Sequence, residues 1–112
     1  MTATTKTAQI ARLNDLLRTT FMSGRVLMTP GVAGLSDEQR SAVVEAVQSF
    51  KAFTPDNDPY GEHDCAVMEV EGVGRVIWKI AYYDWSFEAG SDDPADPAKT
   101  ARVLTIMLGE EY

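Results

Sequence analysis

The residues best suited to chemistry lie together in one short loop, residues 55–64. This loop holds the only histidine of the chain, His63. It also holds a set of carboxylates, namely Asp56, Asp58, Glu62 and Asp64. Two prolines fix φ in the loop and a glycine permits unusual φ values, so the polar groups are held in a specified geometry. Such groups could bind a metal ion, transfer protons or contact a basic partner.

The metal hypothesis depends on a partial match to an EF-hand loop. The acidic residues of the loop fall at ligand positions of such a motif, and Gly61 falls at the position of its glycine. The bidentate glutamate would then fall at Val67, which cannot bind calcium, and Pro59 lies inside the loop. An oxygen-rich transition-metal site on His63 is the alternative, but one histidine without a cysteine pair does not favour zinc. We predict no bound metal and no cofactor.

Proton transfer or hydrolysis would centre on His63. A carboxylate can orient a histidine for acid–base work, and the candidate catalytic residues are His63, Asp64, Tyr60 and Asp84. Adjacent residues on a strand point to opposite faces, however, so Asp64 is not an automatic partner of the imidazole. No oxyanion hole or third member of a triad is recognisable. We therefore predict a non-enzymatic protein, and a small hydrolase or metal-dependent enzyme centred on this loop is the alternative.

Charge is distributed unevenly along the chain, whose formal net charge is −7. Residues 1–55 hold six Lys or Arg against four Asp or Glu, a net charge of +2. Residues 56–112 hold four Lys or Arg against thirteen Asp or Glu, a net charge of −9. Such an acidic half repels bare nucleic acid and attracts a basic protein surface, because phosphate binding depends on Lys and Arg. Acidity also favours solubility, which is the less specific interpretation.

Aromatic residues next to these acids could anchor a basic partner. Tyr83 and Trp85 are expected to point outward beside Asp84, whereas Trp78 and Tyr82 are expected in the core. Aromatic side chains with an acidic rim are typical of protein interfaces, and packing of a loop onto the sheet is the alternative. We predict these partner-binding residues: Asp56, Asp58, Glu62, Asp64, Glu69, Glu71, Tyr83, Asp84, Trp85, Asp92 and Asp93.

Apolar spacing predicts the elements that must position these side chains. Apolar residues three and four apart predict a helix over residues 5–21, and a second helix begins at Ser36 with a Ser-x-x-Gln capping box. A short strand over residues 25–29 lies between them. A third helix is predicted after Pro97, because apolar residues would cover most of its circumference. The order α-β-α-β-β-α predicts an α+β fold with about three helices and a three-stranded antiparallel sheet.

A β-hairpin is predicted directly after the acidic loop. A three-residue turn, residues 72–74, places Glu71 opposite Arg75 and Val70 opposite Val76. That register gathers apolar side chains on one face and polar side chains on the other. A two-residue turn would mix the two faces.

Length and composition set the class of protein. A chain of 112 residues with 45% hydrophobic and 24% charged residues suits a single globular domain, residues 1–112. No apolar run is long enough to span a bilayer, and residues 1–6 lack the apolar core of a signal peptide. One cysteine, Cys65, excludes an internal disulfide and fits a reducing compartment. We predict a cytoplasmic protein.

Several segments of the chain match the pattern of one known family, most specifically residues 55–64, and also residues 13–15, 29–32, 78–80, 82–84, 93–97, 102–108 and 111–112. On these segments, which extend over nearly the whole chain, it resembles a family of short alphaproteobacterial proteins, the domain of unknown function DUF3768. Ala81 stands where the family pattern leads us to expect an acid, and Cys65 stands where it leads us to expect an aromatic residue. A site that used an acid at position 81 would be missing here. The resemblance implies no established activity, but it implies proteins common on plasmids and other mobile elements.

These observations together lead to one functional hypothesis. We predict a small acidic binding protein that occupies the basic surface of a nucleic-acid-binding defence complex, in the manner of an anti-CRISPR or anti-restriction inhibitor. Direct binding of nucleic acid or membrane is not expected. The structural alternative is that the 55–64 loop only fastens the end of the second helix to the hairpin.

Overall fold

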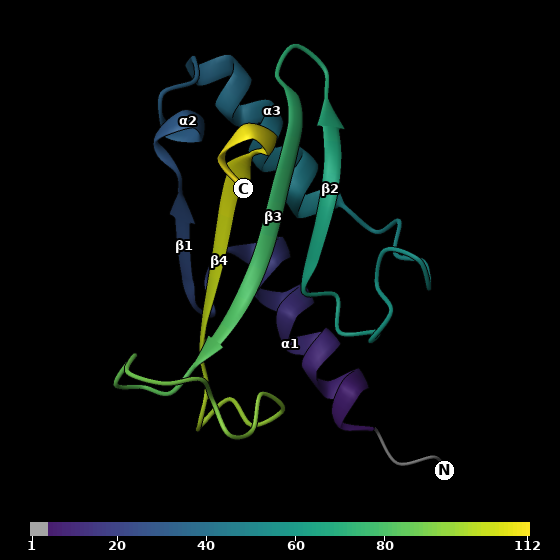
Figure 1. Ribbon diagram of the computed structural model, residues 1–112, viewed down its shortest axis with the longest axis vertical. Helices are drawn as coiled ribbons and strands as arrows, with labels where there is room; N and C mark the ends of the chain where they lie inside the picture. The colour runs from purple at the N-terminus through teal and green to yellow at the C-terminus, as the bar shows by residue number, and fades with distance from the viewer. Residues whose placement is uncertain (1–4) are drawn as a thin grey trace.

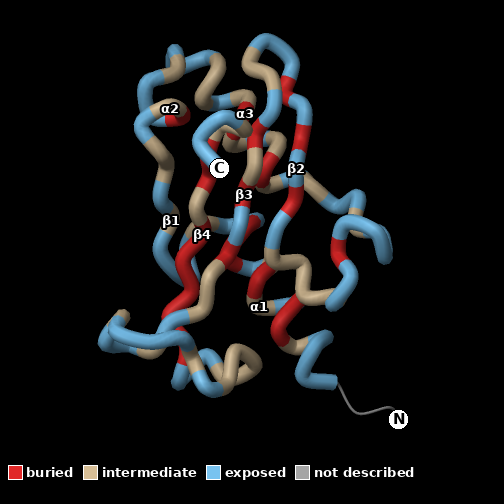
Figure 2. The backbone as a smooth tube through the Cα atoms, in the orientation of Figure 1, coloured by how far each residue is buried: buried red, intermediate tan, exposed pale blue. Residues whose placement is uncertain are grey.

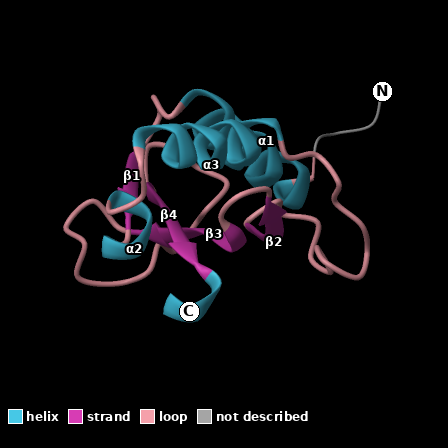
Figure 3. Ribbon diagram, turned by 90° about the horizontal axis from the view of Figure 1, so that it is seen from above, coloured by secondary structure: helices cyan, strands magenta, loops and turns pink. Residues whose placement is uncertain are grey.

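The computed structural model describes residues 5–112. It consists of one β-sheet with two long helices on one side (Figures 1 and 3). In chain order its elements are α1 (Lys6–Thr20), β1 (Arg25–Met28), α2 (Pro30–Ala33), α3 (Asp37–Ser49), β2 (Cys65–Val70), β3 (Gly74–Tyr83), β4 (Ala101–Leu108) and the 3₁₀ turn η1 (Gly109–Glu111). The prediction that residues 1–6 lack the apolar core of a signal peptide falls mostly on residues 1–4, which lie outside the described part. No helix within residues 5–112 combines the length and the apolar character that a bilayer crossing requires.

Both long helices begin at side-chain caps. The Thr5 hydroxyl accepts a hydrogen bond from the backbone N–H of Ala8 at 3.0 Å, which satisfies one of the free donors at the start of α1. At α3, the Ser36 hydroxyl accepts from the Gln39 N–H, and the Gln39 side chain accepts from the Ser36 N–H, both at 3.1 Å. The predicted capping box is therefore confirmed.

The chain has the predicted α+β class, but its sheet differs from the prediction. Within the described residues the sheet has four strands in the order β1-β4-β3-β2. β2, β3 and β4 are antiparallel neighbours, whereas β1 runs parallel to β4. The expectation of three antiparallel strands is wrong in both number and direction, because a segment predicted as helix is a strand.

That segment is Ala101–Leu108, which forms β4 in the interior of the sheet. Apolar residues in succession suit a buried helix and equally suit a strand whose two faces are both covered. The β-branched residues Val103, Thr105 and Ile106 favour the strand. The carboxylate of Asp96 still accepts from the backbone N–H of Ala98 at 2.9 Å, but this bond closes a turn and no helix follows.

β2 and β3 form the predicted hairpin with a register displaced by two residues. Glu69 pairs with Arg75 and Val70 with Gly74, whereas the prediction placed Glu71 opposite Arg75. The turn has three residues as predicted, but they are residues 71–73, and Gly72 and Gly74 adopt φ values of 81° and 107°. Only glycine adopts such values without strain. Because the displacement is even, each side chain stays on its predicted face.

Alternation along the strands directs one face of the sheet to the core. Figure 2 shows β2 changing between exposed and buried from one residue to the next. The buried face packs against α1 and α3, which both lie on the same side of the sheet (Figure 3). Fully buried side chains at this contact include Leu17, Val43, Val47, Trp78 and Leu104. Neither long helix lies on the other side of the sheet.

Candidate functional site

The 55–64 loop folds back so that part of its acidic chemistry faces inward. Asp58 is only 8% exposed, and its two carboxylate oxygens accept from the backbone N–H of His63 at 3.2 and 3.4 Å. Gly61 and His63 have φ values of 70° and 55°, the left-handed region that L residues rarely adopt. The Asp58 bonds compensate for this cost at His63, so the aspartate shapes the loop.

The imidazole of His63 lies between two carboxylates. Its Nδ1 atom lies 3.0 Å from both carboxylate oxygens of Asp15 in α1, and its Nε2 atom lies 3.6 Å from Oδ2 of Asp58. One face of the ring stacks on Phe53, with ring centres 3.9 Å apart and planes 1° apart. Nδ1 is thus within hydrogen-bond distance of a carboxylate, whereas Nε2 lies near the Asp58 carboxylate but beyond hydrogen-bond distance.

Arg18 completes this group from the opposite side of Asp15. Its guanidinium donates to the Asp15 carboxylate at 3.0 Å and to the Val47 carbonyl oxygen at 3.0 Å, and the residue is 3% exposed. The same guanidinium lies 5.5 Å from the ring centre of Phe53 and 5.3 Å from that of Trp78. Asp15 thus bridges a buried cation and His63, and the three side chains connect α1, α3 and the 55–64 loop.

A second polar group surrounds Asn14, which is completely buried. The Asn14 amide nitrogen donates to the Glu62 carbonyl oxygen at 3.0 Å and to the Tyr82 hydroxyl at 2.8 Å. The Tyr82 hydroxyl donates to the Glu62 carboxylate at 2.8 Å. Nε of Arg102 donates to the Asn14 side-chain oxygen at 2.9 Å, and another of its nitrogens donates to the carbonyl oxygen of Pro94. One asparagine therefore connects α1, the 55–64 loop and two strands.

Burial shifts the pKa values of several groups here. The pKa of the Tyr82 phenol lies far above its ordinary value of 10.0, mainly because of burial, so the hydroxyl stays neutral and remains a donor to Glu62. Burial also lowers the pKa of Arg102 below its ordinary value. The pKa of Asp64 is raised above 3.8, chiefly by burial and further by the charges of Glu62 and Asp58. These shifts arise from a packed interior.

The predicted catalytic residues do not converge on one point. The structure brings His63 to Asp58 and Asp15, but Tyr60 is 78% exposed on the outside of the loop. The Asp84 carboxylate accepts from Ser86 and from the backbone of its own turn, with no hydrogen bond to the histidine. Across residues 5–112, no group of three or more His, Cys, Asp or Glu side chains is arranged to hold a metal ion.

The predicted partner-binding residues fall in three places. Asp58 and Glu62 take part in the interior networks just described, while Asp56 is exposed on the same loop and Asp64 is half-buried. Glu69 and Glu71 lie at the β2–β3 turn, at one end of the sheet (Figure 1). The remaining residues lie at the other end of the sheet (Figure 1), where Tyr83 ends β3 and Asp84, Trp85, Asp92 and Asp93 follow it.

Residues 84–96, here called the acidic segment, combine carboxylates with an exposed indole. The segment contains five Asp or Glu and no Lys or Arg. Trp85 is 61% exposed, yet its indole N–H donates to the Ala98 carbonyl oxygen at 3.0 Å, so its orientation is fixed. The Ser86 hydroxyl, which donates to Asp84 at 2.7 Å, is the main reason why the pKa of that carboxyl is lowered. Lys6 reaches Asp93 at 3.7 Å.

Comparison with known protein families shows to which of them this chain belongs. Residues 28–111 match the family model described as "Protein of unknown function (DUF3768)". The chain belongs to the DUF3768 family. This confirms the resemblance, and the matched part of this DUF3768 member includes His63, Tyr82 and Arg102 but not the α1 residues Asn14 and Asp15 that bond to them. Searches among curated proteins and among solved structures found no significant match.

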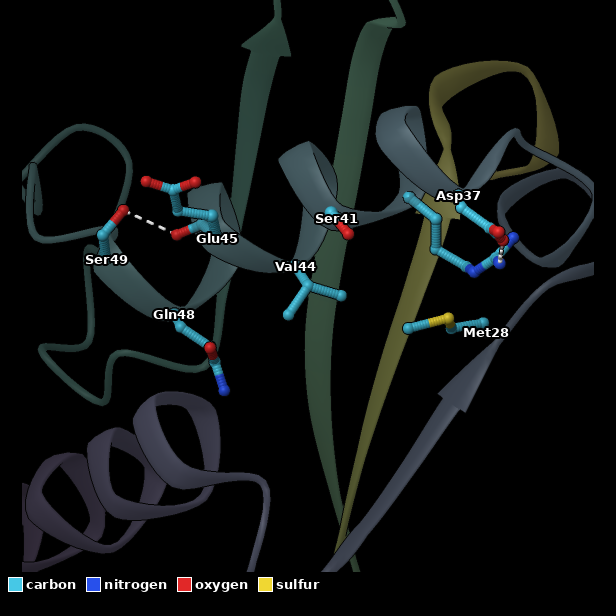
Figure 4. Close-up of a pocket in the computed structure, with 8 residues that line it drawn as sticks. Met28, Asp37, Ser41, Val44, Glu45, Gln48 and Ser49 are labelled. Atoms are coloured by element: carbon cyan, nitrogen blue, oxygen red, sulfur yellow. Dashed lines mark hydrogen bonds and ion pairs between the residues drawn. The ribbon is translucent and has the colours of Figure 1, made fainter.

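A shallow groove follows α3 in this DUF3768 member (Figure 4). Two of its polar side chains are already bonded within the protein: Arg40 pairs with Asp37 and donates to the Leu35 carbonyl oxygen at 2.7 Å, and the Ser49 hydroxyl donates to the Glu45 carbonyl oxygen at 2.7 Å. Met28 lies at one end of the groove, beside Asp37 (Figure 4). Ligand sites are concave and bring a few polar groups to one point, which this groove does not do.

Several interior residues of this DUF3768 member were not predicted, namely Asn14, Asp15, Arg18, Phe53 and Arg102. The sequence does carry a signal for Asn14, because this amide interrupts the apolar stripe formed by Ile10 and Leu17. A polar residue in such a stripe needs buried partners. No comparable signal existed for Arg102, since its segment was predicted to be a helix.

Proposed function

We propose that this DUF3768 protein is a non-enzymatic binding protein whose acidic segment contacts a basic surface of another protein. The observation that carries the proposal is Trp85, which is 61% exposed while its indole N–H is held by Ala98. Exposed tryptophans in a fixed rotamer are frequent energetic anchors of interfaces, because little entropy is lost when a partner covers them. The same segment carries five carboxylates and no Lys or Arg, which gives it a negative charge.

The interior of the 55–64 loop supports a binding role over catalysis. Both ring nitrogens of His63 face carboxylates, Glu62 accepts from Tyr82, and Asp58 holds the loop backbone. These groups fasten the loop to α1 and the sheet. An enzyme would need at least one such group directed at a substrate.

The finer form of the proposal names the partner by its chemistry. A surface that normally binds phosphate presents Lys and Arg side chains, and a carboxylate-rich segment can occupy it in place of nucleic acid. We propose that the partner is a nucleic-acid-binding defence complex of a bacterium, of the CRISPR or restriction type. Exposed Glu88 and Asp92, together with Asp84, would supply the charge.

Co-purification with a CRISPR effector or a restriction enzyme, followed by titration at low and high ionic strength, tests this proposal. Trp85→Ala and the double variant Glu88→Lys/Asp92→Lys should each weaken binding at least tenfold, and binding of the wild-type chain should weaken as salt rises.

A charge-matched control separates this segment from bulk acidity. Glu38→Lys/Glu45→Lys changes the net charge by the same amount on the exposed side of α3. Binding to the defence complex should be nearly unaffected by this pair. Equal weakening by both double variants, or no binding to any such complex, would overturn the proposal.

A further inference from the structure

β2 forms one edge of the sheet, because the strand order is β1-β4-β3-β2 and β2 pairs only with β3 among the described residues. The Ile80 N–H donates to the Asp64 carbonyl oxygen at 2.7 Å, directly before β2, so these two residues form a hydrogen-bonded pair of the ladder. Such pairs alternate along an antiparallel ladder, and the even-numbered residues of β2 therefore bond to β3. The main-chain groups of Val67 and Glu69 point the other way, toward the free edge.

The main chain along this free edge is unpaired. Within residues 5–112, no hydrogen bond from another part of the chain reaches the N–H or C=O groups of Val67 or Glu69. These residues present two N–H donors and two C=O acceptors at the spacing of a strand. An extended polypeptide carries the complementary groups at the same spacing, which is the basis of recognition by strand addition.

The sequence of β2 lacks the features that usually protect an edge strand. Natural sheets block their edges with Lys, Pro, bulges or very short strands. β2 has six residues, none of them Lys or Pro, and its register with β3 runs without a bulge. The opposite edge strand, β1, has only four residues and begins with Arg25. β2 is therefore the edge better suited to pairing.

The centre of this edge is apolar. Val67 is 60% exposed and pairs with the half-buried Ile77 of β3. A hollow lined by Val67, Ile77 and Asn57 lies between the strand and the 55–64 loop, so the loop does not fill the space beside Val67. A β-branched or aromatic side chain placed opposite Val67 would extend this apolar row by one cross-strand pair.

Charge at the edge makes a smaller selection. Near the β2–β3 turn, the exposed carboxylates of Glu69 and Glu71 outnumber the one cation, Arg75, which lies 3.7 Å from Glu69. At the other end of β2, Lys79 and Asp64 line the same hollow with opposite charges. The surplus carboxylate near the turn favours Lys or Arg over Asp or Glu in an added segment.

We propose that β2 binds an extended segment of a partner protein, which joins the sheet as a further strand beside Val67 and Glu69. A β-branched or aromatic residue of the segment would lie opposite Val67, with Lys or Arg near Glu69. This site belongs to β2, whereas the acidic segment follows β3. The inference therefore goes beyond the proposed function and does not depend on it.

The shape of the edge disfavours a second copy of the chain as the occupant. Figure 1 shows the loop between α3 and β2 projecting beyond β2 on the side where a strand would be added. A single strand can pair with the half of β2 nearer the turn, whereas a whole second sheet would meet the loop. Two copies would also bring together two domains of net charge −7.

Selection from a displayed library of random peptides, with the purified protein as the target, tests this inference. The enriched peptides should carry β-branched or aromatic residues at alternate positions, without proline among them. In the complex, hydrogen exchange of the Val67 and Glu69 amides should slow at least tenfold, whereas that of Ala66 and Met68, already bonded to β3, should change little. N-methylation of every second peptide residue should abolish binding in one phase and weaken it far less in the other.

Two variants of Val67 separate strand pairing from loss of fold. Val67→Lys places a charge at the centre of the edge and should weaken the selected peptide at least tenfold. Leu27→Lys makes the same change at a 52% exposed position of the other edge strand, and it should leave binding unchanged. Val67→Thr keeps a β-branched side chain and the same main chain, so it should weaken binding only about threefold. Both positions are exposed, so these variants should fold.

Several results would overturn the inference. These are an absence of enriched peptides, equal weakening by Val67→Lys and Leu27→Lys, or slowed exchange that does not alternate along β2. Concentration-dependent slowing at Val67 and Glu69 without any peptide would assign the edge to a second copy. Loss of peptide binding in Trp85→Ala would place the peptide on the acidic segment. Retained peptide binding in Trp85→Ala supports the inference whether or not the proposed function holds.

Discussion

The Nδ1 atom of His63 lies 3.0 Å from both carboxylate oxygens of Asp15, although the two residues are separated by 48 positions in the chain. Asp15 also accepts from the buried Arg18, so the imidazole is joined to the centre of the helical layer. This contact determines how the 55–64 loop is held. Through this contact the 55–64 loop, the most chemically diverse loop of the chain, connects α1 to the start of β2.

Replacing the histidine should therefore cost stability. In His63→Ala, Asp15 and Asp58 lose a shared partner and Phe53 loses a stacked ring, so we expect the free energy of unfolding to fall by about 2 kcal/mol. Urea denaturation measures the change. Tyr60→Ala removes an exposed ring from the same loop and should change the stability by less than about 0.5 kcal/mol. Wild-type stability in His63→Ala would show that the contacts of His63 with Asp15, Asp58 and Phe53 do not stabilise the fold. That result would favour the alternative in which His63 acts in acid–base catalysis.

Asn14 should be more costly to replace than any single residue of the loop. Asn14→Ala leaves the buried Nε of Arg102 and the Glu62 carbonyl oxygen without their partner, and we expect a loss of about 3 kcal/mol. Because Tyr82→Phe disrupts the same network, the double variant should cost less than the sum of the single variants, by about 1 kcal/mol. Leu16→Ala, at a half-exposed position of α1, is the control. Additive effects would mean that Asn14 and Tyr82 act independently.

Local patterns were sufficient for the elements whose signals are local. The caps and apolar stripes of α1 and α3, the strand at residues 25–28 and both faces of the hairpin could be predicted, because each depends on neighbours in the sequence. β4 could not, because Ala101–Leu108 has no alternation to distinguish a central strand from a buried helix. Because this segment is a strand and not the predicted helix, the sheet has one more strand than predicted and includes the parallel pair of β4 with β1.

In the candidate site, too, features that depend on neighbouring residues could be predicted, whereas contacts between residues far apart in the chain could not. The chemical richness of residues 55–64 was visible in the sequence, but the partners of His63 and Glu62 come from α1 and β3, far away in the chain. The carboxylates that were taken for a contact surface include Asp58, which is 8% exposed. Burial of a loop carboxylate depends on how the loop folds back, and composition alone carries no information on that.

The displaced hairpin register leads to a prediction at Gly72. Its φ of 81° is unfavourable for any residue with a Cβ atom, and no atom lies within 4 Å of the position that the Cβ would occupy. Gly72→Ala should therefore destabilise the protein by about 1 kcal/mol through backbone conformation alone. Gly90→Ala is the matched control, because its Cβ would meet the Tyr82 carbonyl oxygen at an ordinary 3.7 Å. That control should be neutral or slightly stabilising, since alanine restricts the unfolded chain. A neutral Gly72→Ala would contradict the turn at residues 71–73.

Glu111 connects the end of the chain to the segment that joins β1 and α2, and this connection should depend on pH. Its carboxylate accepts from the Thr29 hydroxyl at 2.6 Å, and from the Leu108 and Gly31 backbone N–H groups at 2.9 Å each. The Thr29 bond is the largest cause of the lowered pKa of this carboxyl, followed by the Leu108 bond. A carboxyl whose pKa is lower in the folded state stabilises the fold above its unfolded value, here 4.5, and loses that contribution as pH falls through the folded value.

Glu111→Gln should accordingly unfold more easily than the wild type at neutral pH, and the difference should shrink as the pH falls below 4.5, where both side chains become uncharged. Urea denaturation at a series of pH values measures this. The variant keeps the shape of the side chain, so a loss that persists at low pH would come from packing and would contradict the electrostatic origin. Glu110→Gln alters the neighbouring exposed carboxylate and should show no such pH dependence. A similar pH dependence in both variants would indicate general charge repulsion in an acidic protein, with no specific role for the bonds to Thr29 and Gly31.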